Sequence, residues 1–251
     1  MAAKCVAALY DIHGNLPALE AVLQDVRRAG VDHVVVGGDV LPGPLPVETL
    51  AHLLSLEIPT LFIQGNGERE VLTQMNGAEP ATVPEQFRFI IRWTAEQISP
   101  EHQRVLQSWP AMLRVEIDGV GAVLFCHATP QSDTQIFTSA TAEERLVPLF
   151  TGVDAQVVVC GHTHMQFDRT VGSVRVVNAG SVGMPFGSAG ADWLLIGPDV
   201  QLRHTSYDLA QAAARIRATT YPQAEQFAIH HVLQPPAAEQ MLEAFARAEL
   251  K

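Results

Sequence analysis

The sequence predicts an α/β fold in which two facing sheets carry helices on their outer sides. Two observations support this prediction. In the first third of the chain, short apolar runs alternate with helical patterns, which is the order that builds a parallel sheet. After about residue 160, strand patterns follow one another closely, and a second sheet is needed to accommodate them. No internal repeat or low-complexity linker interrupts this order.

Buried strands are predicted where short continuous apolar runs are bounded by turn residues. The runs are residues 5–10, 33–36, 60–63, 122–126 and 155–160. Two helices are predicted between the first three runs. Asn15 can cap the first helix, which keeps apolar residues at helical spacing until Gly30. The second helix begins at Pro46 and stops before Pro59, because proline removes a helix donor.

The middle of the chain is predicted to be helical before it forms a hairpin. Residues 84–109 indicate two helices, and the break between them falls at Ser99, which is the expected N-cap of the second. Residues 114–118 and 122–126 flank a glycine-rich turn, and this pattern is typical of two antiparallel strands joined in a hairpin.

The last third of the chain combines strands with a helical tail. Thr141 and Glu144 have the spacing of a capping box ahead of a short helix that reaches Phe150. From residue 208 the chain is rich in alanine and helical in pattern, with interruptions at prolines. Further strands are expected at residues 174–177, 193–196 and 200–206.

Composition and charge narrow the possible functions. Of the 251 residues, 47% are hydrophobic and 17% are charged, which favours a packed core over disorder. The net charge of −11 argues against a broad surface for nucleic acid or anionic membranes. We find no signal peptide and no apolar stretch of about 18 residues. We therefore expect a cytoplasmic protein without a membrane partner, with small buried cysteines at Cys5, Cys126 and Cys160.

Polar side chains follow five of the predicted strands at the points where those strands end. Each fragment alone is weak, because a single histidine after an apolar run is more often part of the core. Together they converge, because the carboxyl ends of parallel strands meet at one edge of a sheet. Their carboxylate and imidazole groups, without thiolate, suit divalent Mn, Fe, Zn, Co or Ni. The candidate ligands are Asp11, His13, Asp39, Asn66, His127, His162 and His164.

The order of these motifs resembles that of the calcineurin-like metallophosphoesterases. The motifs are Asp-x-His, Gly-Asp, Gly-Asn, His and Gly-His-x-His. Residues 11–22 (DIHGNLPALEAV), 161–166 and 178–183 (NAGSVG) are most similar to the small bacterial and archaeal YfcE-type branch. The resemblance implies a four-layer α-β-β-α sandwich of two facing mixed sheets. It implies a metallophosphoesterase domain at residues 1–207, and we expect residues 208–251 to form a helical extension packed on the same domain.

The resemblance also implies a dinuclear metal centre, for which Mn is the expected ion and Fe, Zn, Co and Ni are alternatives. In this family pattern a hydroxide shared by the two ions hydrolyses phosphodiesters or activated phosphomonoesters. Asp39, Asn66 and His127 are then the predicted catalytic residues. The ligands would be Asp11, His13 and His164 for one ion and Asn66, His127 and His162 for the other, with Asp39 bridging both.

Gly14, Asn15 and Asn66 are the predicted contacts to the substrate, a small phosphate ester. Gly14 and Asn15 begin a helix directly after the first ligands, so their backbone N–H groups and the helix dipole suit a phosphate oxygen. Simple capping of that helix is an equally good interpretation of Asn15. The sequence carries no indication of the oligomeric state.

The chain departs from the family pattern at Gly67, where most active members carry a histidine that assists the leaving group. General-acid assistance contributes about 10²–10⁴ in rate, so we expect a preference for good leaving groups. A Gly67→His variant would test this. Another histidine could replace the missing one, although each of the others is most simply a surface residue: His33, His52, His102, His204, His230 and His231. A milder departure is Ala128, beside a ligand.

Two other functions compete with a phosphoesterase. A catalytically weakened member of the fold could act as a binding or scaffold module, and Gly67 favours that possibility. Seven polar ligands packed together without metal would be costly, which argues against it. A metal-dependent nuclease would share the chemistry, but the chain lacks the basic stripe that a nucleic acid requires.

Overall fold

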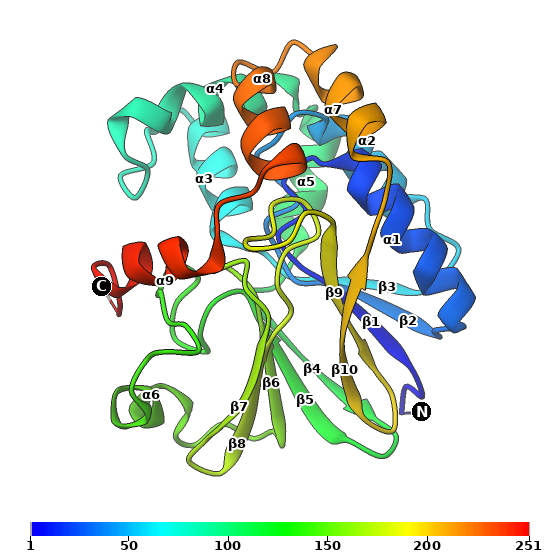
Figure 1. The fold of residues 1–251 in the computed structure, drawn as a ribbon, viewed down its shortest axis with the longest axis vertical. Coiled ribbons are helices and arrows are strands. Elements are labelled where there is room, and N and C mark those ends of the chain that lie inside the picture. The colour runs from blue at the N-terminus through cyan, green and yellow to red at the C-terminus, as the bar shows by residue number, and fades with distance from the viewer. Residues whose placement is uncertain (1, 251) are drawn as a thin grey trace.

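The computed structural model describes residues 2–250 and contains two five-stranded sheets that face each other (Figure 1). Strands β1, β2 and β3 are neighbours in the first sheet and run parallel. β9 returns late in the chain to pair antiparallel with β1, and β10 pairs with β9. In order across the sheet, the strands are β10 (Val200–Thr205), β9 (Ala191–Ile196), β1 (Val6–Leu9), β2 (His33–Val36) and β3 (Thr60–Phe62).

The second sheet is also mixed. Its three inner strands are parallel, and its two edge strands are antiparallel to their neighbours. The predicted hairpin between residues 114–118 and 122–126 is confirmed as the first antiparallel pair. In order, the strands are β4 (Met112–Ile117), β5 (Gly121–Cys126), β6 (Val157–Cys160), β8 (Val174–Asn178) and β7 (Phe167–Val171).

Helices cover the outer face of each sheet and complete the predicted four-layer sandwich. One helix, α6 (Glu143–Phe150), packs on the second sheet. The helices that share the core of the first sheet are α1 (Leu16–Ala29), α2 (Pro46–Leu54), α3 (Asn66–Met75), α4 (Arg88–Gln97) and α5 (Pro100–Ser108). Strand alternation sends Ala7 and Leu9 toward these helices and Val6 and Ala8 toward the opposite sheet.

The helix caps explain why α1 and α5 begin and end where they do. The Asn15 side chain accepts a hydrogen bond from Ala18 N at 3.3 Å, and Gly30 ends α1 in the left-handed conformation. The Ser99 side chain accepts from His102 N at 3.1 Å and starts α5. The capping of α1 by Asn15 and of α5 by Ser99 is therefore confirmed.

Three local features differ from the predictions. The α3 helix was not predicted, because Asn66 and its neighbours had a competing interpretation as a ligand loop. Strand β7 also escaped prediction, because its interior Asp, Arg and Thr lie on an edge strand and break the apolar run. The capping box at Thr141 and Glu144 is wrong. The Thr141 hydroxyl accepts from Thr138 N, and α6 begins at Glu143 without a side-chain cap.

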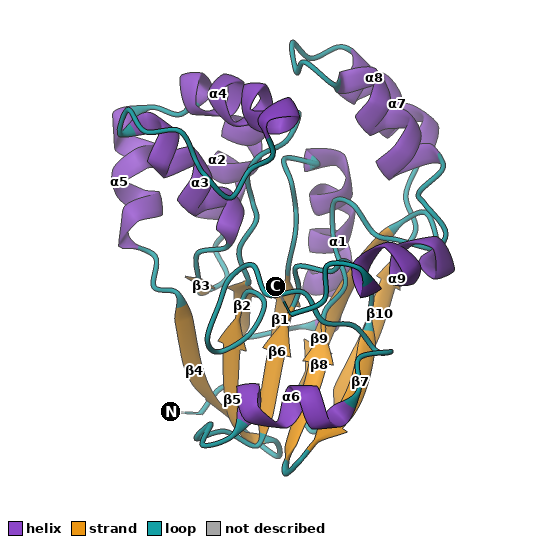
Figure 2. Ribbon diagram, turned by 90° about the vertical axis from the view of Figure 1, so that its left-hand side faces the viewer, coloured by secondary structure: helices purple, strands orange, loops and turns teal. Residues whose placement is uncertain are grey.

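The C-terminal segment contains α7 (Leu209–Arg217), α8 (Ala224–Phe227), the π-helix η2 (Ala228–Leu233) and α9 (Ala238–Ala246). The first three of these pack on the helices of the first sheet. Their apolar residues share a core cluster with Ile90 and Trp93 of α4, and the Trp93 and Tyr221 rings lie 5.3 Å apart edge to face. The α9 helix lies outside that cluster, and the ring of its Phe245 lies 6.1 Å from the ring of Phe186. Figure 2 shows α4, α7 and α8 beyond one end of the strands. None of the helices within residues 2–250 has the length and apolar character to span a bilayer.

Candidate metal centre

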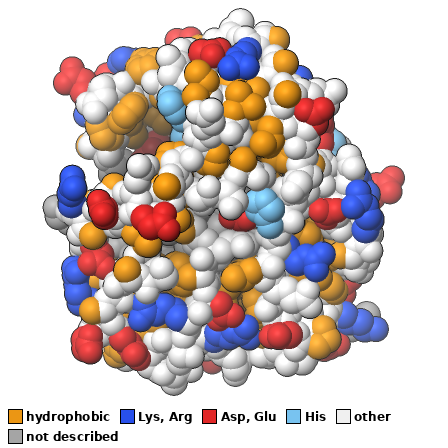
Figure 3. Space-filling view, in the orientation of Figure 1, with side chains coloured by type: hydrophobic (Ala, Val, Ile, Leu, Met, Phe, Trp, Pro, Cys, Tyr) orange, Lys and Arg blue, Asp and Glu red, His pale blue; other side chains and the backbone are white. Residues whose placement is uncertain are grey.

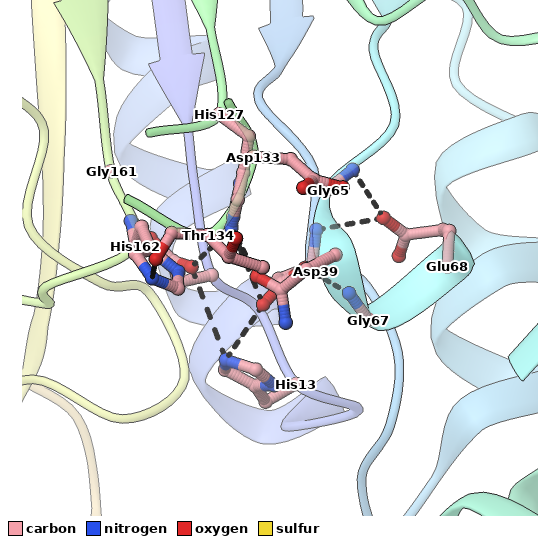
Figure 4. A network of polar contacts seen from close by, with 12 residues as sticks. His13, Asp39, Gly65, Gly67, Glu68, His127, Asp133, Thr134, Gly161 and His162 are labelled. Carbon is pink, nitrogen blue, oxygen red and sulfur yellow. Dashed lines mark hydrogen bonds and ion pairs between the residues drawn. The ribbon is translucent and has the colours of Figure 1, made fainter. Parts of the chain in front are cut away.

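The seven predicted ligands lie together at one end of both sheets. Figure 4 labels His13, Asp39, His127 and His162 among them. The loops after β1, β2 and β3 carry the ligands of the first sheet, and the loops after β5 and β6 carry those of the second. The convergence follows from the parallel strands, whose carboxyl ends all point to this edge. From the first sheet come Asp11, His13, Asp39 and Asn66, and from the second come His127, His162 and His164.

The candidate ligands form two groups. Within each group, the ligand atoms lie within 4.8 Å of one another. One group is Asp11, His13 and His164, and the other is Asp39, His127 and His162. Asp39 Oδ2 lies 3.7 Å from His13 Nε2 in the first group and 3.4 Å from His127 Nε2 in the second. Asp39 therefore stands between the two groups, where a bridging carboxylate is expected.

Each of the four histidine rings is held by a hydrogen bond to a backbone carbonyl. A ring nitrogen bound to a carbonyl must carry the proton, so the other nitrogen presents its lone pair to the centre when the ring is neutral. This pattern is typical of metal-binding histidines. The contacts are His13 Nδ1 with Pro42 O (3.2 Å), His127 Nδ1 with Gly37 O (3.0 Å), His164 Nδ1 with Met184 O (2.9 Å) and His162 Nε2 with Thr134 O (3.2 Å).

The inward-facing atoms need a cation to satisfy them. His13 Nε2 and His164 Nε2 lie 3.2 Å apart, and both are lone-pair donors in the neutral rings just described. Asp11 Oδ1 is buried without any hydrogen-bond partner. The Asn66 amide oxygen faces ring nitrogens of His127 and His162. This contact becomes favourable if the amide is rotated so that its NH₂ group donates to these nitrogens, or if a cation lies between the three atoms. The residues thus fit divalent metal ions bound by oxygen and nitrogen.

The charges at the site favour a positive group beside Asp39. In the chain alone, burial lowers the pKa of His127, but the carboxylates of Asp39 and Asp11 outweigh burial and raise it to about 10. Burial and the nearby His127 lower the pKa of His162 to about 4. The His162 ring is therefore neutral in the chain alone, whereas a metal ion at this position would have to displace a proton from His127.

Five predicted ligands have a left-handed backbone conformation that residues other than glycine rarely adopt. Their φ angles are positive: 52° for Asp11, 46° for His13, 51° for Asp39, 66° for His162 and 56° for His164. Within residues 2–250, Leu250 is the only other non-glycine residue in that region. Such conformations cost about 1–3 kcal/mol each and cluster at functional sites. The fold therefore fixes the directions of these ligands through the backbone.

The structure leaves no room for a side chain at Gly67, the position at which most family members carry a histidine. A Cβ atom on Gly67 would lie 2.0 Å from the backbone oxygen of Leu41, in the loop after β2. No side chain fits there unless that loop moves. The Gly67→His variant would therefore disturb the loop that carries Asp39, and its activity would not report on leaving-group assistance.

A Gly67→Ala variant is expected to unfold at a temperature about 4–8 °C lower than the parent, because overpacking against rigid backbone costs about 2 kcal/mol. Thermal unfolding followed by circular dichroism measures the change. Gly197→Ala is the matched control, since its Cβ would meet only ordinary contacts, the nearest at 3.5 Å. Equal midpoints for the two variants would contradict the assignment of a closed space at Gly67.

Two sets of residues that support the ligands were not predicted as functional. Glu68 is fully buried, and its carboxylate accepts from the backbone N–H groups of Gly65 and Asp39, both at 2.9 Å, and of Leu41 at 3.0 Å (Figure 4). The Ser181 hydroxyl donates to Asp11 O at 2.7 Å, and Asn178 donates to Gly161 O at 2.7 Å. The Gly-x-x-Glu spacing and the NAGSVG stretch were visible signals.

The contacts of Gly14 and Asn15 serve the fold. Gly14 N donates to Val40 O and Asn15 N donates to Ile12 O, at 2.9 and 3.0 Å. The Asn15 side chain caps α1 and also donates to Gly183 O at 2.8 Å. A role of Gly14 and Asn15 in substrate binding stays a prediction, and these bonds count against it.

Six histidines lie outside the two groups, and three of them have informative surroundings. His204 Nδ1 lies 2.7 Å from Asp192 Oδ1, so His204 has a structural partner. His230 and His231, in contrast, line a pocket together with His13. These two are the histidines that the structure brings to the edge of the predicted centre.

Comparison with known proteins agrees with this geometry. A family model described as the calcineurin-like phosphoesterase superfamily domain matches residues 5–196. The chain therefore belongs to the calcineurin-like phosphoesterase superfamily, and the resemblance to its YfcE-type branch is confirmed. The chain is 27% identical over 199 residues to the Escherichia coli K12 phosphodiesterase YfcE, covering 76% of this chain and 85% of that protein.

Three further comparisons are informative. The uncharacterized protein MJ0912 of Methanocaldococcus jannaschii is 32% identical over 133 residues, and the match spans about half of each chain (52%). The metallophosphoesterase from Sphaerobacter thermophilus has a TM-score of 0.70 at 26% identity, covering 90% of this chain and 97% of that one. The hypothetical protein PH1004 from Pyrococcus horikoshii OT3 has a TM-score of 0.76 at 19% identity, covering 94% and 100%, and shows the shared fold alone.

Proposed function

We propose that the protein is a phosphoesterase that depends on two divalent metal ions and hydrolyses phosphodiesters or activated phosphomonoesters. The observation that carries this proposal is the pair of donor groups joined by Asp39, in which the His13 and His164 ring nitrogens face each other and Asp11 Oδ1 is buried without a hydrogen-bond partner. Membership of the superfamily supports the reaction class, and the YfcE similarity supports diesters.

The chain's own residues would perform three tasks. Asp11, His13 and His164 would hold one ion, Asn66, His127 and His162 the other, and Asp39 both. When bound, two ions would neutralise phosphate oxygens and lower the pKa of an attacking water. Asp39, Asn66 and His127 would thus orient the reacting groups, and the burial of Asp39 and His127 would keep bulk water away from their charges.

The closed space at Gly67 bears on the preferred substrate. No imidazole stands there to protonate a leaving oxygen, and that assistance is worth about 10²–10⁴ in rate. We therefore infer a preference for small esters with good leaving groups. A net charge of −11 disfavours a polyanionic substrate such as nucleic acid. Mn is the proposed metal, because the ligands combine carboxylates, an amide and imidazoles.

Metal analysis followed by a substrate panel tests the proposal. Protein purified without chelators and loaded with Mn is expected to bind about two ions per chain, as two donor groups require. It is expected to hydrolyse bis-para-nitrophenyl phosphate faster than an alkyl phosphomonoester. The chelated protein serves as the control. Protein that binds no metal and turns over no ester would refute the proposed function.

A binding role without catalysis is a second candidate function, and the obstruction at Gly67 is the observation that favours it. The buried polar side chains of the two donor groups argue against this role, because burying them close together costs free energy that a protein without catalysis has no need to spend. The same experiment separates the two functions, because a binding module would take up metal and leave every ester intact.

A further inference from the structure

A pocket of about 280 Å³ opens beside the predicted metal centre. His13, one of the predicted ligands, forms part of its wall, together with Pro42 and Met184 from the neighbouring loops. A phosphate held at the metals would therefore present one of its substituents to this space. In Figure 3, hydrophobic side chains and a histidine gather around a hollow near α4 and α8.

The opposite walls of the pocket are largely aromatic. Phe87 ends the short 3-10 helix η1 (Glu85–Phe87), and it is 45% exposed, which is unusual for a large apolar side chain. Tyr221 and Phe227 come from the C-terminal segment, and their rings meet edge to face at 6.1 Å. None of the described residues that line the pocket is Asp, Glu, Lys or Arg. The walls therefore suit a flat neutral group and disfavour a second charged one.

Polar groups also face this pocket. Gln223 and Gln226 supply amides, and His230 and His231 supply imidazoles. His231 Nδ1 is buried without a hydrogen-bond partner, and its ring lies 5.1 Å from the ring of Phe227. A neutral imidazole can donate one hydrogen bond and accept another.

The backbone around these histidines is also unusual. Both belong to η2, a six-residue π-helix. π-Helical turns are rare and occur frequently at functional sites, because the wider turn redirects side chains. The unassigned C-terminal segment thus brings aromatic, amide and imidazole groups to the edge of the metal centre.

We propose that this pocket binds a neutral planar heterocycle, of the nucleobase type, carried by the phosphate ester, and that His231 hydrogen-bonds its edge. The aromatic walls match the faces of such a ring, and the amides and imidazole match its polar rim. Its volume lies just below the range of about 300–1,000 Å³ for pockets of drug-sized ligands, so one ring system fits and a polynucleotide does not. This inference rests on the proposed function.

Three diesters that share one leaving group test the proposal. They are the para-nitrophenyl phosphates of thymidine, phenol and methanol, assayed with the full chain and Mn. The shared nitrophenolate keeps the chemical step comparable, so ratios of kcat/KM report on the second substituent. We expect the thymidine ester to be preferred to the methyl ester by about tenfold or more. The His231→Phe variant is expected to lower that preference about fivefold, the effect of one lost hydrogen bond.

His102→Phe is the matched control, because His102 is also partly buried with an unpartnered Nδ1 but lies on α5, outside the pocket. Its preference is expected to equal that of the parent. Gln226→Trp is a second variant at an exposed lining position that tolerates substitution. It is expected to fill the pocket and reduce the preference for the thymidine ester even if His231→Phe fails to fold.

The outcomes separate this inference from the proposed function. Hydrolysis of the methyl ester by the parent protein tests the function alone. If all three esters are hydrolysed equally well, the pocket assignment is wrong while the phosphoesterase stands. Equal preference for the phenyl and thymidine esters, unchanged in His231→Phe, would likewise overturn the hydrogen-bonded heterocycle.

Discussion

Replacing Asp39 with Asn is expected to lower phosphodiester turnover by about 10³-fold and to reduce bound metal from two ions to about one. A thousandfold loss corresponds to about 4 kcal/mol, which is the scale of metal-ion catalysis. The substitution keeps the size of the side chain. It also keeps an oxygen that can accept the hydrogen bond that Gly67 N donates to Asp39 Oδ1 in the parent protein, at 2.7 Å. It removes the negative charge that lies between the two groups. Turnover and metal content, measured on one preparation, check the result.

Asp192→Asn is the matched control for the Asp39 variant. Asp192 is also largely buried and pairs with a histidine, His204, at 2.7 Å, but it belongs to neither donor group. Its turnover and metal content are expected to match those of the parent. If Asp39→Asn retained two ions and most of its activity, Asp39 would have no bridging role.

Replacing Glu68 with Gln is expected to lower the free energy of unfolding by about 3 kcal/mol and the melting temperature by about 6–12 °C. The carboxylate accepts from three backbone N–H groups, two of them through one oxygen. An amide offers one oxygen only, and its NH₂ group must face at least one backbone donor. A buried donor then loses its partner. Since those donors include Asp39 N, metal affinity is expected to fall as well.

Glu70→Gln controls for the loss of a buried carboxylate on the same helix. Glu70 is 7% exposed and accepts from one side chain, Thr82, at 3.0 Å. Its replacement is expected to change the melting temperature by only a few degrees, because one exchangeable hydrogen bond is affected. Denaturant unfolding of the two variants in parallel decides the comparison. Equal losses would mean that Glu68 does not anchor the ligand loops.

The convergence of the candidate ligands could be predicted because its cause is simple. The candidate ligands lie in the segments that follow apolar strands, and parallel strands place their carboxyl ends together. Their role as metal ligands stays a prediction. The α3 helix could not be predicted in the same way, because Asn66 is both a candidate ligand and the first residue of that helix. Tertiary packing decided between two local patterns that the sequence supports equally.

The supporting features depend on contacts between distant segments and were beyond prediction. The closed space at Gly67 depends on the position of one carbonyl, that of Leu41, in another loop. The pocket depends on how the C-terminal helices return to His13, and no motif marks that path. The left-handed backbone at Asp11 and His13 has only a weak signal in residue type: Asp and His adopt it more often than most residues, but glycine is the usual choice there.

The return of β9 and β10 to the first sheet makes assembly of the centre a late event in biosynthesis. All seven candidate ligands have been synthesised once His164 has been added. The loop of Asp11 is still open at that stage, because its carbonyl is bonded by Ser181 and Gly183. β1 also lacks its neighbour until β9 is made. A nascent chain therefore contains every candidate ligand before it can hold them in place, so we expect any metal uptake to follow the synthesis of the last strands.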